Sequence, residues 1–356
     1  MKKTVLGAMV VAMAALTSNA FATSGYDKKF FISSDDGAYT LSPGVLIDGM
    51  WTRVDADGEA GDMEYISLQR TRAWMRGSWG EEFSYDVTVE SDMVPHVIDK
   101  QGTTANSTDV MTKFKYVNLT HNLGMVKLRF GLQKLTVGGD IQESAAAYQF
   151  VARPTANKVG SAIMAGGGDP AGGLALVGSA AGVNYTLGLW ENNKMDGSVM
   201  TNGYDMSVDV SYTGLGKMTS GMSDLMGERA YTVGVGAYYN NTTPGVDNNY
   251  QTAWLKYKGG GYSFGLDYHM GTAAKKTSGL VLRVGKVFAE NQEVAFRYDS
   301  YDSDKDAEGE LTTMSLAYNY FFNGENAKVM AQYDMADDTA AKAKSNTMYV
   351  KYHISF

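Results

Sequence analysis

The chain has 356 residues, with 31 Lys and Arg against 39 Asp and Glu, and it contains no cysteine. The acidic balance disfavours nucleic-acid binding, because proteins that bind nucleic acids usually carry a basic surface. The absence of cysteine excludes disulfide bonds and thiolate metal sites. Beyond residue 22 there is no run of about 18 apolar residues, which excludes membrane-spanning helices.

The first 22 residues have the pattern of a cleavable secretory signal. Lys2 and Lys3 precede an apolar run over residues 5–16, and Ala20-Phe21-Ala22 is an A-x-A cleavage site. The apolar run is too short to span a bilayer as a helix. We therefore expect the chain to be exported, and we expect residues 23–356 to form one domain.

Apolar and polar residues alternate along the rest of the chain, which is the pattern of strands with one apolar and one polar face. A polar lead-in is expected at 23–36 and a polar loop at 93–109. The pattern predicts sixteen strands, over residues 38–51, 65–79, 83–91, 111–120, 126–134, 173–179, 183–190, 204–212, 231–239, 250–258, 262–270, 279–288, 293–301, 311–322, 327–335 and 346–356.

The last strand indicates how these strands assemble. Met348, Val350, Tyr352, Ile354 and Phe356 share one parity, and the chain stops on that aromatic residue. An open terminal strand leaves an edge that invites aggregation, whereas a barrel that pairs its last strand with its first has no edge. The even strand number fits a transmembrane antiparallel β-barrel. The long irregular stretch at 136–172 is expected to be functional, as an infolded constriction loop.

Charged residues on the expected strands should line the lumen. Arg or Lys on the lipid face near the bilayer midplane costs about 2–4 kcal/mol. The alternation therefore points inward a basic wall made of Arg70, Arg72, Arg76, Lys113, Lys115, Lys127 and Arg129. If the loop folds inward, Asp140, Glu143 and Asp169 are expected to place carboxylates across from this wall. Facing rows of charge of this kind select ions in pores.

Three other interpretations stay open. Glu82, Asp86 and Glu90 lie on the strand between the basic ones, so the wall is also consistent with a general polar lining held by cross-strand ion pairs. A cation-preferring pore also stays open because further acids are expected to face the lumen, namely Asp205, Asp209, Asp267, Glu293 and Asp299. A barrel with a structural or adhesive role is the remaining alternative.

Four segments carry a family resemblance. They are Gly25–Gly37 at the start of the mature chain, Gln69-Arg70-Thr71-Arg72, Leu128-Arg129-Phe130-Gly131-Leu132-Gln133-Lys134 and Tyr148-Gln149-Phe150-Val151-Ala152-Arg153. In this order they resemble the phosphate-selective porin O and P family of Gram-negative outer membranes. The chain departs from that pattern at Gln69, where the family tends to carry an arginine, and at Asn157-Lys158-Val159-Gly160.

The resemblance implies a passive outer-membrane channel for small hydrophilic solutes, with phosphate or other anions as the expected solutes. It also implies a homotrimer in contact with lipid and lipopolysaccharide. The terminal strand ending in Phe356 is expected to be recognised by the barrel-assembly machinery. We expect no enzymatic activity, cofactor, metal or nucleic acid.

One motif points to a different chemistry. Gly261-Tyr262-Ser263-Phe264-Gly265 matches the G-x-S-x-G nucleophile pattern, and Asp267 and His269 share the parity of Ser263. That motif requires a turn from a strand into a helix. Here Tyr262, Phe264, Leu266 and Tyr268 continue as a strand, so an outer-membrane hydrolase is only a minor alternative.

Overall fold

The computed structural model describes residues 22–26, 30–56, 62–93, 96–99, 104–105, 110–164, 170–191, 204–219, 221–225, 229–240, 248–273, 275–305 and 309–356. Residues 1–21, which make up nearly all of the expected signal, lie outside this set. Within the described residues, no helix is long and apolar enough to cross a membrane.

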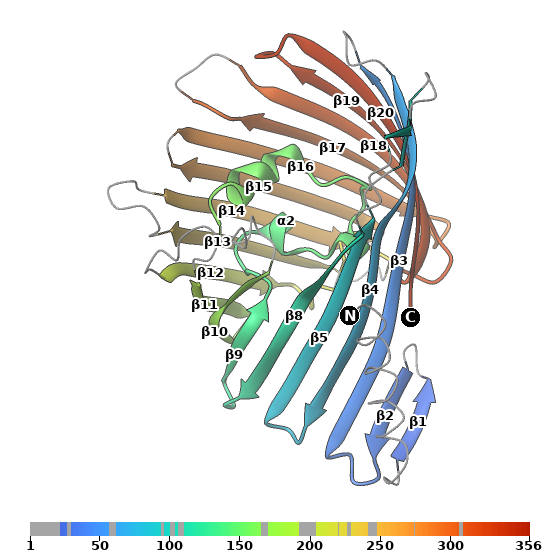
Figure 1. The fold of residues 1–356 in the computed structure, drawn as a ribbon. Coiled ribbons are helices and arrows are strands. Elements are labelled where there is room, and N and C mark those ends of the chain that lie inside the picture. The colour runs from blue at the N-terminus through green and yellow to red at the C-terminus, as the bar shows by residue number, and fades with distance from the viewer. Residues whose placement is uncertain are drawn as a thin grey trace.

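Sixteen antiparallel strands form a closed barrel (Figure 1). Neighbouring strands in chain order pair with each other, and β20 pairs with β3 to close the barrel, with Ile354 opposite Ile47. The strands are β3 (Tyr39–Ala56), β4 (Met63–Trp79), β5 (Phe83–Met93), β8 (Val110–Asn122), β9 (Val126–Gln133), β10 (Ala171–Ala180), β11 (Val183–Glu191), β12 (Tyr204–Gly214), β13 (Ala230–Asn240), β14 (Asn248–Gly259), β15 (Tyr262–Thr272), β16 (Lys276–Phe288), β17 (Gln292–Asp302), β18 (Leu311–Phe321), β19 (Ala327–Asp338) and β20 (Ala343–Ser355).

All sixteen predicted strands are confirmed, and they differ from the structure mainly at their ends. The structure also contains short strands that the alternation did not predict. The expected lead-in holds the hairpin β1 (Ala22–Tyr26) and β2 (Phe30–Ser34), and the loop expected at 93–109 holds β6 (His96–Asp99) and β7 (Thr104–Ala105). These strands are two to five residues long, too short for a periodic pattern to show.

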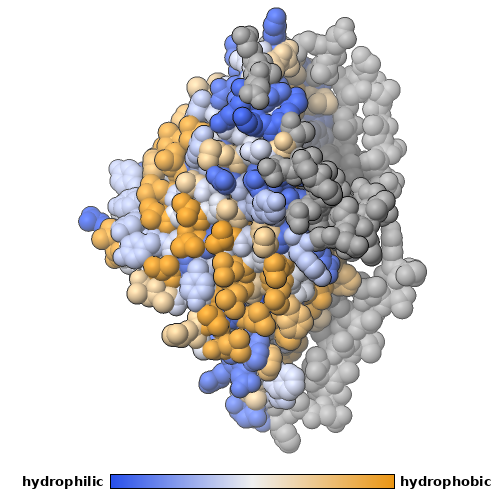
Figure 2. All heavy atoms as spheres, turned by 90° about the vertical axis from the view of Figure 1, so that its left-hand side faces the viewer, coloured by the Kyte–Doolittle hydropathy of each residue, from blue (hydrophilic) through white to orange (hydrophobic). Residues whose placement is uncertain are grey.

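The barrel is apolar outside and polar inside. On β12, Val208 and Val210 are exposed while Asp209 between them is 7% exposed; on β16, Leu282 and Val284 are exposed while Arg283 is 3% exposed. Figure 2 shows apolar residues gathered over the middle of one outer face, with hydrophilic residues above and below them. This arrangement suits a barrel whose outer surface contacts lipid.

The segment between β9 and β10 folds into the barrel (Figure 1). It contains the short helices α2 (Gly139–Gln142) and α3 (Lys158–Ser161) and the 3-10 turns η1 (Ala145–Ala147) and η2 (Thr155–Asn157). Its apolar residues Leu135, Val137 and Val159 are fully buried in a cluster with Tyr238 and Tyr250 of the barrel wall. We call residues 134–170 the constriction loop; the expected infolded loop is confirmed.

Candidate pore constriction

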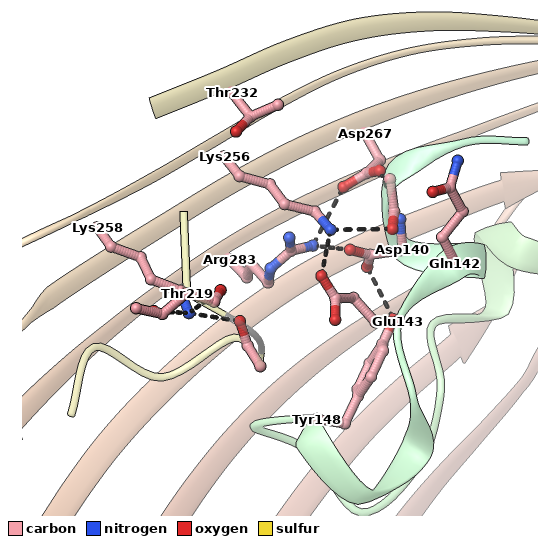
Figure 3. A network of polar contacts seen from close by, with 12 residues as sticks. Asp140, Gln142, Glu143, Tyr148, Thr219, Thr232, Lys256, Lys258, Asp267 and Arg283 are labelled. Carbon is pink, nitrogen blue, oxygen red and sulfur yellow. Dashed lines mark hydrogen bonds and ion pairs between the residues drawn. The ribbon is translucent and has the colours of Figure 1, made fainter. Parts of the chain in front are cut away.

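The constriction loop is fixed to one half of the barrel wall by ion pairs (Figure 3). Arg283 on β16 pairs with Asp140 of the loop and, at 3.1 Å, with Asp267 on β15. Lys256 on β14 pairs with Glu143. Burial raises the pKa of Asp140, but Arg283 and Lys256 outweigh burial and hold that pKa below its ordinary value. Asp140 and Glu143 therefore bind cations of the β14–β16 wall.

Hydrogen bonds extend this attachment along the loop. Lys328 donates to the carbonyl of Tyr148 at 2.9 Å, and Arg297 donates to the carbonyl of Ala152 at 2.7 Å. The amide of Thr155 donates to Asp299 Oδ1 at 3.0 Å. Because the donors and acceptors come from β17 to β19, the loop covers the lumenal face of the strands from β14 to β19.

Five acids were the reason to consider a cation-preferring pore. In the structure these acids contact the constriction loop or other residues of the barrel wall. Asp209 accepts from the amide of Gly138, and Asp267 accepts from that of Asp140. The other contacts are those of Tyr238 with Asp205, Gln149 with Glu293, and Thr155 with Asp299. All five acids are at most 7% exposed, so their charges face protein groups instead of open lumen.

An open cavity of about 660 Å³ lies on the other side of the loop, against β4 and β8. Seven of its lining residues are cationic: Arg70, Arg72, Arg76, Lys115, Lys134, Arg153 and Lys158. Among the described residues that line it there is no Asp or Glu. This cavity is the candidate site.

The cations of the barrel wall are paired with acids behind the cavity surface. Glu90 on β5 binds Arg70, Arg72 and Lys115, at 3.3 Å from Arg70 Nε and 3.1 Å from Lys115 Nζ. Asp86 binds Arg76 at 2.9 Å. A second acid, Asp48 on β3, lies 3.6 Å from Arg70 and also binds Lys351 and His353 of β20. The wall charge is therefore partly neutralised.

The cations of the loop are different. Among the described residues, Lys134, Arg153 and Lys158 have no carboxylate within ion-pair distance. Lys134 donates to the carbonyls of Gln142 and Glu143, Arg153 to those of Asp140 and Glu143, and Lys158 lies 6.0 Å from the ring centre of Tyr301. Burial, with a contribution from Arg153, lowers the pKa of Lys134 to about 7.

Sequence reasoning missed these three residues as site residues. Alternation assigns a face only within a regular strand, and residues 134, 153 and 158 lie in the irregular loop. Their presence in a loop expected to fold inward was a usable signal, because any charge there lies near the lumen. The prediction considered only the acids of the loop, Asp140, Glu143 and Asp169, and so passed over these three cations.

The remaining expected site residues lie at the edge of this cavity or away from it. Lys113 lies opposite Glu90 in register. Lys127 and Arg129 lie on β9, where Arg129 donates to Thr120 Oγ1 at 3.3 Å, and neither lines the cavity. Asp169 lies outside the described residues.

Bulges interrupt the alternation on two strands beside the cavity. The pairing of β5 with β8 skips Lys115, between Val89–Phe114 and Thr88–Tyr116, so Tyr116 lines the cavity together with Lys115. Strict alternation from Lys115 would place Tyr116 on the opposite face of the strand. The pairing of β3 with β4 shifts similarly at Asp48 and Gly49, beside Arg70. A bulge reverses the parity of the residues that follow it, and alternation alone does not show where it occurs.

A second cavity of about 550 Å³ shares Arg76 with the first. It is lined by the lumenal residues Thr40, Ser42 and Ser78 and by Phe356 at the C-terminus. The two cavities thus meet at β4, and the second extends along β3 toward the C-terminus.

The residues of the hydrolase motif do not form a catalytic group. Ser263 and His269 are six residues apart on β15, which places their Cα atoms roughly 20 Å apart at the usual rise of a strand. Ser263 Oγ accepts from Gln149, and His269 Nδ1 contacts the hydroxyl of Tyr250 at 2.8 Å. No group of three or more His, Asp or Glu in the described part of the chain is placed to hold a metal.

The sequence matches no protein-family model and no curated protein. Solved structures are similar over most of the chain. The anion-selective porin from Comamonas acidovorans aligns over 89% of this chain and 100% of its own, with a TM-score of 0.65 and 14% identity. OmpF from Salmonella typhi, in complex with daunomycin, aligns over 93% and 100%, with a TM-score of 0.63 and 13% identity.

A third similar structure is the trimer form of OmpT, an outer membrane protein of Vibrio cholerae. It aligns over 90% of this chain and 100% of its own, with a TM-score of 0.58 and 13% identity. The closed sixteen-stranded barrel of this chain, with its infolded loop, therefore has the fold of the outer-membrane porins.

Proposed function

We propose that this chain is an outer-membrane porin that forms a passive, water-filled channel and favours small anions, with phosphate among them. The observation that carries the proposal is the cavity beside the constriction loop, with seven cationic side chains and no carboxylate among its described lining residues. A water molecule occupies about 30 Å³ in the liquid, so a cavity of about 660 Å³ has room for roughly twenty waters.

The geometry suggests how an anion would pass. Arg72 and Arg76 lie on the barrel wall, and Arg153 and Lys158 lie on the loop, so cations line both sides of the cavity. A guanidinium group binds phosphate or carboxylate oxygens in a bidentate manner, while an ammonium group acts as a point charge. An anion would exchange part of its hydration shell for these donors without any group being transferred.

The fold, the sequence and the similar structures also support a cellular location, an oligomeric state and an ion preference for this protein. The barrel fold, its apolar outer face and the signal-like residues 1–22 support export to a Gram-negative outer membrane. The trimer form of the similar Vibrio cholerae protein supports a homotrimer. The resemblance to an anion-selective porin supports the proposed sign of the preference.

Conductance in planar bilayers tests the proposal. The purified protein should give stable channels in potassium chloride, and added phosphate should reduce the chloride current because it occupies the same cavity. The combined substitution Arg72→Gln with Arg153→Gln should weaken this block.

The matched control is Lys342→Gln, which removes an exposed cation in the turn after β19. This variant should keep the block of the unmodified protein. Absence of channels would refute the porin assignment, and channels that phosphate does not affect would refute the proposed occupancy.

A further inference from the structure

A second segment enters the lumen, from the end opposite to the constriction loop. The connection between β12 and β13 spans residues 215–229, whereas the neighbouring connections at the same end, between β10 and β11 and between β14 and β15, have two residues each. Met222, Ser223 and Asp224 of this connection are all less than 5% exposed. We call residues 221–225 the strap.

The strap is fixed to the barrel wall at both of its ends. Lys258 on β14 donates to the carbonyl of Gly221 and, at 3.2 Å, to that of Thr219 (Figure 3). Asp224 accepts from the amide of Gly261 at 2.7 Å. Gly221 has a φ of +85°, and a Cβ there would lie 2.9 Å from Glu325, so this entry into the lumen favours glycine.

The middle of the strap contacts the constriction loop directly. The amide of Met222 donates to the carbonyl of Ala147 at 2.9 Å. The side chain of Met222 belongs to a buried cluster with Tyr148 and Phe150 of the loop. The guanidinium group of Arg153 lies 5.1 Å from the ring centre of Tyr148. Met222 of the strap thus packs on Tyr148, which in turn contacts Arg153, one of the loop cations that line the cavity.

One carboxylate joins both segments to the wall. Glu293 on β17 accepts from Ser223 of the strap at 2.8 Å and from Gln149 of the loop at 2.6 Å. Asn319 on β18 also donates to it, at 2.8 Å. The carboxylate thus has polar partners in the strap, the loop and the neighbouring strand, and loss of one partner leaves a buried acceptor less well satisfied.

We infer that the strap is a positioning segment, which holds residues 145–153 of the constriction loop and thereby sets the anion preference of the pore. This inference rests on the proposed channel function. Met222 and Ser223 do not line the cavity. The inference is that they nevertheless affect selectivity, because they hold Ala147, Tyr148 and Arg153 in place.

The test combines a structural readout with a functional one. In Met222→Ala/Ser223→Ala, backbone amides of residues 145–150 should exchange with deuterium faster than in the unmodified protein. In planar bilayers the same variant should show a larger single-channel conductance and a reversal potential shifted toward zero. Ser223→Ala alone removes one hydrogen bond and should show the same changes to a smaller degree. This single variant keeps the test decisive if the double variant does not fold.

Leu215→Ala is the matched control, because Leu215 belongs to the same connection but is 76% exposed. It should leave both the exchange and the reversal potential unchanged. Unaltered exchange at 145–150 in both strap variants would overturn the inference, and so would faster exchange with an unaltered reversal potential. If the unmodified protein forms no channel, the proposed function fails, while the exchange experiment still decides whether the strap holds the loop.

Discussion

Glu90 contacts three of the cations that the sequence assigns to the pore wall. Arg70, Arg72 and Lys115 share this one carboxylate, and Asp48 lies near Arg70 from the other side. Lys134, Arg153 and Lys158 have only carbonyl or ring contacts among the described residues. The loop cations therefore differ from the wall cations, because no carboxylate of the described residues lies within ion-pair distance of them.

Two substitutions that each remove one charge should move the ion preference in opposite directions. Glu90→Gln removes the acid shared by Arg70, Arg72 and Lys115, so anion preference should increase; Arg153→Gln should decrease it. A unit charge about 4 Å from a permeant ion in water contributes about 1 kcal/mol, or roughly a fivefold change in the permeability ratio. Reversal potentials in a salt gradient measure both effects.

Lys342→Gln is the control for both substitutions, because it removes an exposed charge outside the lumen. A shift of Glu90→Gln toward cations would contradict the assignment of Glu90 as the neutralising acid. Equal reversal potentials for Arg153→Gln and the control would show that Arg153 does not face the path of the ions.

The low pKa of Lys134 predicts a pH-dependent preference. With a pKa of about 7, this side chain is charged below pH 7 and neutral above it. The cavity therefore loses one positive charge as the pH rises from 6 to 8.5, and anion preference should fall over this range. Reversal potentials at the two pH values measure the change, and Lys134→Met should abolish it. A change of the same size in Lys134→Met would assign the titration to another group.

The constriction loop does not hold its shape independently of the barrel. Its longest helices have four residues, too few for independent helical stability, so its shape comes from contacts with the wall. Arg283 of β16 makes two deeply buried ion pairs, one with Asp140 of the loop and one with Asp267 of β15. Arg283 therefore binds the loop and the neighbouring strand through one guanidinium group.

Arg283→Met should destabilise the protein by about 3–5 kcal/mol, because it leaves Asp140 and Asp267 buried without their counterion. The measurement is the free energy of unfolding in urea, with the barrel in lipid vesicles. The control is Lys344→Ala, which removes an exposed partner of Asp337 and should cost less than about 1 kcal/mol. Similar losses for both variants would contradict the account of how the loop is held.

The order of the strands could be predicted because its signal is local. On β12, exposed Val208 and Val210 lie on either side of buried Asp209. This alternation is visible in adjacent residues, on this strand as on the others, so it can be recognised without knowing which strands pair. The site was predictable only where it lies on such strands, as for Arg70, Arg72, Arg76 and Lys115. The bulge at Lys115 that brings Tyr116 to the cavity depends on pairing with a partner strand, which alternation does not contain.

Contacts between distant segments could not be predicted in the same way. Glu293 binds Gln149 and Ser223, which are 144 and 70 residues away along the chain. Nothing in the local sequence of β17 indicates such partners. The same limit applies to Arg283 and Asp140, and it explains why the loop acids were expected to face the basic wall.

The whole molecule separates its charges. The chain has a formal net charge of −8, yet seven cations and no described acid line the cavity beside the loop. The lumenal acids of the other half are held by the loop and the wall, and exposed acids such as Asp55 and Asp337 lie near the strand ends. The net charge of the chain therefore does not describe the charge that lines this cavity.

The reversal potential of the purified protein under a potassium chloride gradient shows whether this cavity sets the ion preference. The arrangement of the cavity predicts a potential whose sign reports chloride as the more permeant ion. A potential that reports potassium as the more permeant ion would show that acidic groups control the path, and it would contradict the proposed role of the constriction loop and the basic wall.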